Sequence, residues 1–265
     1  MPTFSSFDNN QKKEQQTVTQ TVDLTDKQAK GAFLSKVYGW MFICLLITTV
    51  VAAGLGYGMM ALLISVAGNE ELFSGIITGM VVTLIVSVIA LLVMSFVLPI
   101  TFIRGKHNII VPLIIYVVLM GVLLSTFTWL FEPVILAEAF GITALIFGIM
   151  ALLGHLSKGK VAGIGVIMLG LIIGAGLLSI VNFVMILVGG IKPENVMLSW
   201  IVSLAIFAFL MFMTMWDVAR ITQIASKGDT GNNNLVHYCA YILYSDFIAL
   251  LVRVVYYLAI FTRRR

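Results

Sequence analysis

The stretch that decides the fold is residues 236–261, VHYCAYILYSDFIALLVRVVYYLAIF, an apolar run that carries Asp246 and Arg253. About 20 apolar residues, each rising 1.5 Å along a helix, cross the hydrocarbon of a bilayer, so this run is long enough to span a membrane. On a helix, Asp246 and Arg253 share one face, with Leu250 between them. Because that face is too polar to suit lipid, we expect this helix to lie inside a bundle formed by the rest of the chain.

The composition of the whole chain is that of an integral membrane protein. Hydrophobic residues make up 60% of the 265 residues and charged residues 11%, whereas about a quarter of the residues in soluble domains are charged. The formal net charge of +4 comes from 16 basic and 12 acidic residues with little clustering, which indicates membrane topology and no nucleic-acid partner. The two cysteines, Cys44 and Cys239, form neither a disulfide framework nor a zinc motif.

Seven apolar runs follow a polar N-terminal segment, and each run is long enough to cross a bilayer. Residues 1–32 have too few large apolar side chains to offset the entropy of ordering, which predicts a polar disordered tail before a membrane domain at 33–265. The first run is overlong and glycine-rich, so we expect it to bend or to end early. The sequence therefore predicts an all-α membrane protein with seven transmembrane helices, at residues 37–67, 76–103, 109–131, 134–156, 161–188, 196–219 and 236–261.

The basic residues that flank these runs fall mainly on one side of the membrane. Lys192 lies on the other side, together with four glutamates. Basic residues favour the cytoplasmic side, so we expect a cytoplasmic N-terminus. A seventh full crossing would place the three arginines at 263–265 outside, and the side of that cluster stays open. The nine residues on the cytoplasmic side are Lys27, Lys30, Lys36, Arg104, Lys106, Lys158, Lys160, Arg220 and Lys227.

A second acidic residue, Asp217, lies in the sixth run at a depth similar to that of Asp246. If the sixth helix extends to about Ile224, Asp217 lies roughly 10 Å from its cytoplasmic end and Asp246 about 15 Å from the start of the seventh helix. A short connection makes the two helices antiparallel neighbours, so we expect the two carboxyl groups to meet. Two carboxylates in a low dielectric cannot both stay ionised cheaply, which predicts a shared proton. Arg104, if it lies nearby, would favour their ionisation.

Simpler explanations exist for these charged residues. Asp217 could merely mark the cytoplasmic interface, and Asp246 could be a structural partner of Arg104 or Arg253. Glu138 follows Pro133 near the start of the fourth helix, where an acid suits the positive end of the helix dipole. We favour that explanation for Glu138 over a role in admitting calcium.

Three segments resemble the Bax-inhibitor family, the transmembrane Bax-inhibitor-motif proteins, in its bacterial branch: LYSDFIALLVR around Asp246, WDVARI at Asp217 and LAEAFGITALIFG around Glu138. The resemblance covers the chain from about residue 32 to its end. It implies two layers of three helices around the last helix, a location in the inner membrane of a bacterium, and a pH-sensitive calcium leak pathway. By this resemblance Asp217 and Asp246 match the aspartate pair that senses pH, where calcium would bind transiently, and Arg104 matches the latch on the second helix.

Two features depart from the pattern of that family. Arg220 stands three residues after Asp217, where a polar residue, often glutamine, is usual, and it adds a positive charge near the pair. The segment 226–235, SKGDTGNNNL, is longer than expected and could alter how the cytoplasmic mouth closes.

Two classes of function remain open. The leading hypothesis is a passive, pH-gated calcium pathway in the lipid bilayer that uses no cofactor. The alternative is a non-conducting regulator that binds another membrane protein, such as a quality-control protease. We expect no enzyme activity, because the chain lacks the G-x-S-x-G and H-E-x-x-H motifs of hydrolases. A retinal photoreceptor is excluded because the seventh run has no lysine.

Overall fold

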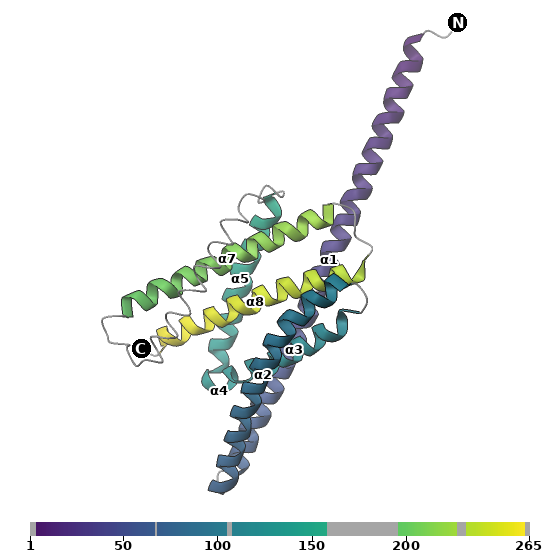
Figure 1. Ribbon diagram of the computed structural model, residues 1–265. Helices are drawn as coiled ribbons and strands as arrows, with labels where there is room; N and C mark the ends of the chain where they lie inside the picture. Colours follow the sequence, from purple (N-terminus) through teal and green to yellow (C-terminus); the bar gives the residue numbers. More distant parts are fainter. Residues whose placement is uncertain (1–3, 67, 105–107, 158–195, 227–231, 263–265) are drawn as a thin grey trace.

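The computed structural model describes residues 4–66, 68–104, 108–157, 196–226 and 232–262, and these residues form helices throughout, with no strand among them (Figure 1). Side chains are described from Gln28 onward in the first helix, over 203–226 in α7 and over 232–259 at the C-terminal end. In chain order the helices are α1 (Phe4–Val66), α2 (Glu70–Arg104), α3 (Ile110–Leu124), α4 (Phe127–Leu130), α5 (Pro133–Leu156), α7 (Val196–Ser226) and α8 (Asn233–Thr262).

Six helical segments in this part of the chain are long and apolar enough to cross a membrane. They correspond to six of the seven runs predicted from the sequence, and the remaining run, 161–188, lies outside the described residues. The chain is therefore an all-helical membrane protein over the described ranges. The six segments are Gln28–Val66, Glu70–Arg104, Ile110–Leu130, Pro133–Leu156, Ser203–Ser226 and Asn233–Ala259.

The first helix is longer and more continuous than the sequence predicted. Helix α1 passes without interruption through its glycine-rich part and ends at Val66. Gly56 serves a packing purpose there, because a Cβ at this position would overlap the side chain of Thr128 in α4. The indole Nε1 of Trp129 also donates a hydrogen bond of 2.8 Å to the Gly56 carbonyl oxygen. The glycine thus lets α4 approach α1 closely.

Helix α1 also crosses residue 32, where the sequence predicted the end of a disordered tail, as one continuous helix. Phe33 and Leu34 are the first buried side chains in its described part. The division of the chain at this point remains a prediction.

The third predicted run is divided into α3 and α4 by two residues, Ser125 and Thr126. Each hydroxyl group donates a hydrogen bond of 2.7 Å to the carbonyl oxygen three residues earlier, Ser125 to Val122 and Thr126 to Leu123. Such local side-chain bonds compete with the regular helical pattern. These bonds accompany a break that hydrophobicity alone did not predict.

Helix α8 occupies the middle of the described bundle. It packs against α1, α5 and α7, and less extensively against α2 and α3. In Figure 1 it runs alongside α7 and crosses α5. In the most apolar stretch of α8, 39% of the residues are buried, whereas the corresponding share in the other five membrane segments is 17–33%. The helix with the deepest charges is therefore the one most enclosed by protein.

Hydroxyl and aromatic groups join α8 to the helices on one of its sides. The Tyr244 hydroxyl lies 2.6 Å from the Thr48 hydroxyl of α1. Tyr241 packs edge-on against Tyr116 of α3, with ring centroids 5.2 Å apart. These contacts give the side of α8 that faces α1 and α3 a fixed register, because buried hydroxyl groups need their hydrogen-bond partners.

On the opposite side of the bundle, Gly154 lets α5 approach α7 closely. A Cβ at position 154 would lie 2.5 Å from the main-chain oxygen of Met215 and 2.9 Å from Cβ of Val218. Neither atom belongs to a flexible side-chain end that could turn aside. The spacing of α5 and α7 next to Asp217 therefore depends on the absence of a side chain at position 154.

We predict that Gly154→Ala lowers the free energy of unfolding by about 1–3 kcal/mol, the usual cost of overpacking. Gly148→Ala is the matched control, because it lies on the same helix and a Cβ there meets nothing within 4 Å. Thermal unfolding of the two variants in detergent measures the effect. Equal stability of both would show that α5 and α7 can separate without cost.

Candidate functional site

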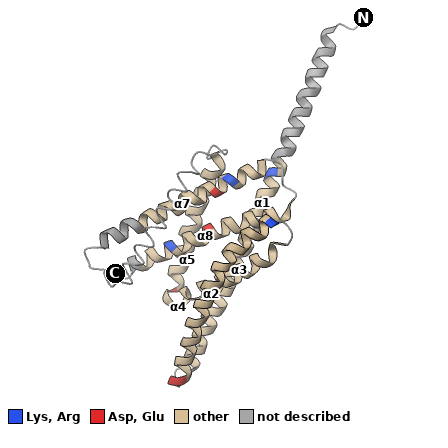
Figure 2. Cartoon of the chain, viewed as in Figure 1, with Lys and Arg blue, Asp and Glu red and all other residues tan. Residues whose placement is uncertain are grey.

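The candidate site lies where α7 and α8 carry one aspartate each. Asp217 is on α7 and Asp246 is on α8, both inside the segments long enough to cross a membrane. Figure 2 shows that acidic residues occur within these two helices, away from the ends of the bundle. The structure brings together these two residues, which the sequence placed at a similar depth.

The carboxyl groups of Asp217 and Asp246 lie within hydrogen-bonding reach of each other. An ionised carboxylate only accepts hydrogen bonds, so two carboxylates cannot form such a bond. A hydrogen bond between the two therefore requires a proton on one of them. This makes the contact between α7 and α8 sensitive to protonation.

Both carboxyl groups lie largely out of reach of solvent. The Asp217 side chain is 6% exposed, and it lies between Thr214 and Val218, each 1% exposed. Asp246 is partly buried, but its Oδ2 atom is buried and has no hydrogen-bond partner in the structure. An unsatisfied buried oxygen costs about 1–3 kcal/mol, which makes this oxygen a place where a proton or a cation would be stabilised.

The site offers carboxylate oxygens, which are the ligands that hard cations prefer. It has too few of them to hold such a cation permanently. Calcium takes six to eight oxygen ligands, carboxylates among them. Within the described residues no group of three or more His, Cys, Asp or Glu side chains gathers in a way that could hold a metal ion. The pair can therefore offer carboxylate oxygens to a passing cation, with water or main-chain oxygens completing the shell.

Arg220 is the cation whose charge acts on the pair. It interacts electrostatically with Asp217, three residues earlier on α7. The same guanidinium acts on Tyr238 and Cys239 at the start of α8, and it lies over the Trp216 ring, 5.6 Å from the ring centroid. Its side chain is exposed, so solvent weakens the interaction.

The other charged residues singled out in the sequence lie apart from the pair. Arg104 is exposed at the end of α2, and Arg253 is half-buried on α8. Among the described residues, neither arginine forms an ion pair or hydrogen bond with either aspartate. Glu138 is exposed on α5, beside the buried Ala139. In this state the structure brings neither Arg104 nor Arg253 nor Glu138 to the aspartate contact.

Two histidines take part in packing that the sequence did not reveal. His155 Nδ1 lies 3.1 Å from the Thr222 hydroxyl and joins α5 to α7. His237 is 4% exposed, and its ring packs edge-on against Trp40 of α1 with centroids 4.6 Å apart. Both histidines lie in apolar segments, where the sequence gives no indication of which residue each one contacts. Only the folded arrangement identifies their partners.

The proton in the aspartate contact predicts how stability depends on pH. The contact is present at acidic pH and is lost as the pH rises and both groups ionise. Asp246→Asn keeps a hydrogen bond at every pH, because its amide N–H can donate to an ionised Asp217. We predict that the free energy of unfolding of the wild type falls by roughly 1.5–3 kcal/mol from mildly acidic to mildly alkaline pH. Asp246→Asn should remove most of this pH dependence, and thermal unfolding at several pH values measures it.

Glu138→Gln is the control for this measurement, because it removes one exposed acid from α5 and leaves the contact unchanged. It should keep the slope of the wild type. If Asp246→Asn and Glu138→Gln gave the same slope as the wild type, the carboxyl contact would make no contribution to pH-dependent stability.

Comparisons with known proteins place this arrangement in a family. The chain is 29% identical over 239 residues to "Inner membrane protein YbhL" of Escherichia coli (strain K12), and the match covers 88% of this chain and 92% of that protein. The protein of the same name from Escherichia coli O6:H1 matches equally well. The family model described as "Inhibitor of apoptosis-promoting Bax1" matches residues 30–263, a range that contains all six described membrane segments except the first two residues of α1's segment. The chain belongs to this family, the Bax-inhibitor family of membrane proteins.

Proposed function

We propose that the chain is a pH-sensitive leak pathway for calcium ions in the inner membrane of a bacterium, controlled by protonation of Asp217 and Asp246. The observation that carries this proposal is that two carboxyl groups inside membrane-spanning helices lie within hydrogen-bonding reach of each other. A hydrogen bond between them exists only while a proton is present, so the contact between α7 and α8 would depend on pH. The "inner membrane" in the name of the relative from Escherichia coli supports the location.

Ionisation would change the site in two ways at once. The hydrogen bond is replaced by repulsion between two negative charges, which drives α7 and α8 apart near these residues. The same step exposes carboxylate oxygens, the ligands that calcium prefers. The protonated pair therefore corresponds to the closed state, and the ionised pair to a state that can bind and pass a cation. Since no chemical bond is made or broken in such a leak, the proposal requires neither enzyme activity nor a cofactor.

The proposal includes a topology. Seven helices cross the membrane in two layers of three around α8, with the N-terminus in the cytoplasm. The position of α8 between α1 and α5 supports a central last helix. Arg104, at the end of α2, then lies at the cytoplasmic interface, and its role as a latch requires α2 to move toward the pair. Arg220 already acts on Asp217 in this state, so it is the first cation to test.

Calcium flux through purified protein in liposomes tests the proposal. We predict that flux rises as the pH increases through the loss of the shared proton, and that Asp246→Asn flattens this dependence because asparagine carries no titrating group. Glu138→Gln should retain the pH dependence of the wild type. Absence of flux at every pH would refute the leak pathway and leave the alternative function, a regulator that binds another membrane protein.

The two arginines are predicted to differ in their effect on the pH profile. A positive charge favours the ionised pair, so its removal lets the pair keep its proton to higher pH. We predict that Arg220→Gln moves the midpoint of the flux profile toward alkaline pH by more than Arg104→Gln does. Arg220→Lys keeps the charge and should restore the midpoint.

A structural role for Arg220 would give a different result. Loss of its contact with the Trp216 ring would lower flux at every pH and leave the midpoint unchanged. A larger midpoint shift in Arg104→Gln than in Arg220→Gln would show that Arg104 reaches the pair in the conducting state.

A further inference from the structure

A cavity of about 560 Å³ lies between α1 and α5. These two helices each pack along α8 but make little contact with each other. The gap between them is therefore floored by α8, through Ile248, Leu251 and Val255, and closed at one end by α3 and α4. Ile248 and Val255 are 4% and 2% exposed, so the floor is deep inside the bundle.

The rim of this cavity is exposed among the described residues. Phe42 and Tyr57 of α1 are 59% and 54% exposed, and Phe140 of α5 is 42% exposed. All three belong to segments that can cross a membrane. In the part of the chain that the structure describes, the cavity therefore opens sideways, toward the lipid tails that surround membrane-spanning helices.

Apart from Tyr57 at its rim, the polar side chains of the cavity offer no free hydrogen-bond donor. Thr48 donates toward the Val117 carbonyl oxygen and lies next to the Tyr244 hydroxyl. Thr49 donates to the Leu45 carbonyl oxygen at 2.8 Å. Thr128 donates to the Ser125 carbonyl oxygen at 2.7 Å. An occupant with polar groups inside the cavity would lose its hydrogen bonds to water without replacement. The cavity therefore favours an occupant that is purely hydrocarbon.

The dimensions of the cavity suit a single extended chain. The lining residues of α1 run from Phe42 to Tyr57, which at 1.5 Å per residue is roughly 22 Å of the about 30 Å hydrocarbon thickness. The volume lies in the range of about 300–1,000 Å³ that is typical of ligand sites. Tyr57 stands at the end near α4, and tyrosine is enriched where the bilayer meets water. A lipid head group can lie there while its tail extends along α8.

We propose that this cavity binds one acyl chain of a membrane lipid, which fills the space between α1 and α5 and contacts the buried face of α8. An empty space of this size would forfeit the dispersion contacts of all the side chains around it. The acyl chain supplies them and acts as a non-covalent spacer between the two helices.

This site is independent of the aspartate contact. Val255 is nine residues, or two and a half helical turns, from Asp246, so the cavity and the carboxyl groups lie on opposite faces of α8. Lipid binding can therefore be present or absent whatever the flux measurements show.

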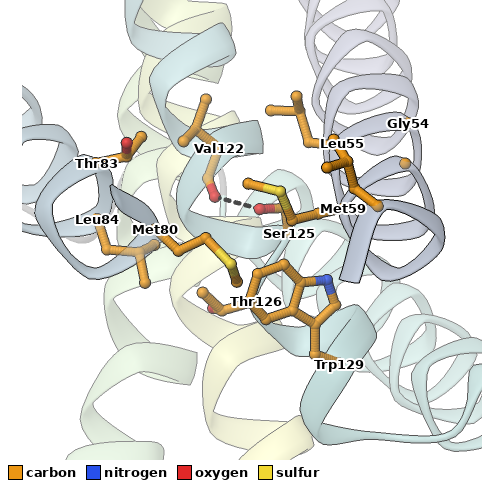
Figure 3. A pocket seen from close by; sticks show the side chains of 12 residues that line it. Gly54, Leu55, Met59, Met80, Thr83, Leu84, Val122, Ser125, Thr126 and Trp129 are labelled. Atoms are coloured by element: carbon orange, nitrogen blue, oxygen red, sulfur yellow. Dashed lines mark hydrogen bonds between the residues drawn. The ribbon is translucent and has the colours of Figure 1, made fainter. Parts of the chain in front are cut away.

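A second, smaller cavity shows that lateral openings of this kind flank α1 on both sides. It has a volume of about 340 Å³ and lies between α1, α2, α3 and α4. Figure 3 shows the side chains of Met59 and Met80 reaching into it from α1 and α2, with Trp129 below them. Its lining on α1 extends only from Gly54 to Leu62, which leaves the larger cavity as the site for a full acyl chain.

Photocrosslinking in vesicles tests the proposal. The probe is phosphatidylcholine with a diazirine in one acyl chain, mixed into phosphatidylcholine vesicles that contain the full-length protein. We predict labelling of Ile248, Leu251 or Val255, which lipid at the outer surface cannot reach. Val50, 70% exposed on α1, should be labelled in every variant and reports ordinary lipid contact.

Filling the cavity should abolish the labelling of α8. Ala53→Phe places a ring in the cavity from α1, and Ala137→Leu narrows it from α5. Ala61→Phe is the matched control, because Ala61 is an exposed alanine of α1 that lines neither cavity. The two filling variants should lose the label on α8 and keep the label on Val50, and the control should keep both.

Two results would overturn the proposal. Labelling of Val50 without any labelling of α8 in the wild type would show that protein, and not lipid, closes the cavity. Labelling of α8 that persists in both filling variants, with thermal stability unchanged, would show that lipid reaches α8 by another route.

Discussion

The approach of two carboxyl groups, held largely away from water between α7 and α8, is the interaction on which the rest of the structure depends. A hydrogen bond between them requires a proton, and its loss leaves two like charges in a medium that separates them from solvent. The surrounding helices must hold Asp217 and Asp246 close enough to share that proton. In the proposed leak pathway they must also allow the pair to separate when the proton leaves.

The packing around the pair meets both requirements with different residues on different sides. On the side of α5, Gly154 removes any side chain between the helices, so α7 is held at a short distance from α5. On the far side of α8, the contact between Tyr244 and Thr48 fixes α8 against α1. The carboxyl contact is thus placed between two rigid attachments. Repulsion between the ionised carboxylates would act mainly on the α7–α8 contact, because the attachments on either side do not titrate.

The sequence predicted the parts of this arrangement that follow from periodicity and depth. Six of the apolar runs became membrane segments, and the similar depths of Asp217 and Asp246 predicted the meeting of their carboxyl groups. The break after Leu124 was not predicted, since it lies within a continuous apolar run and is visible only in the path of the main chain. The place of Arg104 could not be derived either, because its distance from the pair depends on how α2 crosses α8. The role of Gly154 is visible only once the main chain of α7 is placed beside it.

The absence of a direct interface between α1 and α5 has a consequence for how this chain can vary in evolution. Helix α8 has to match the helices on its two sides at the same time, so a substitution on it is constrained by two sets of neighbours. The surfaces of α1 and α5 that face each other are under no such mutual constraint, and a change in one requires no compensating change in the other. Variation between relatives should therefore accumulate along those two surfaces, while α8 changes slowly.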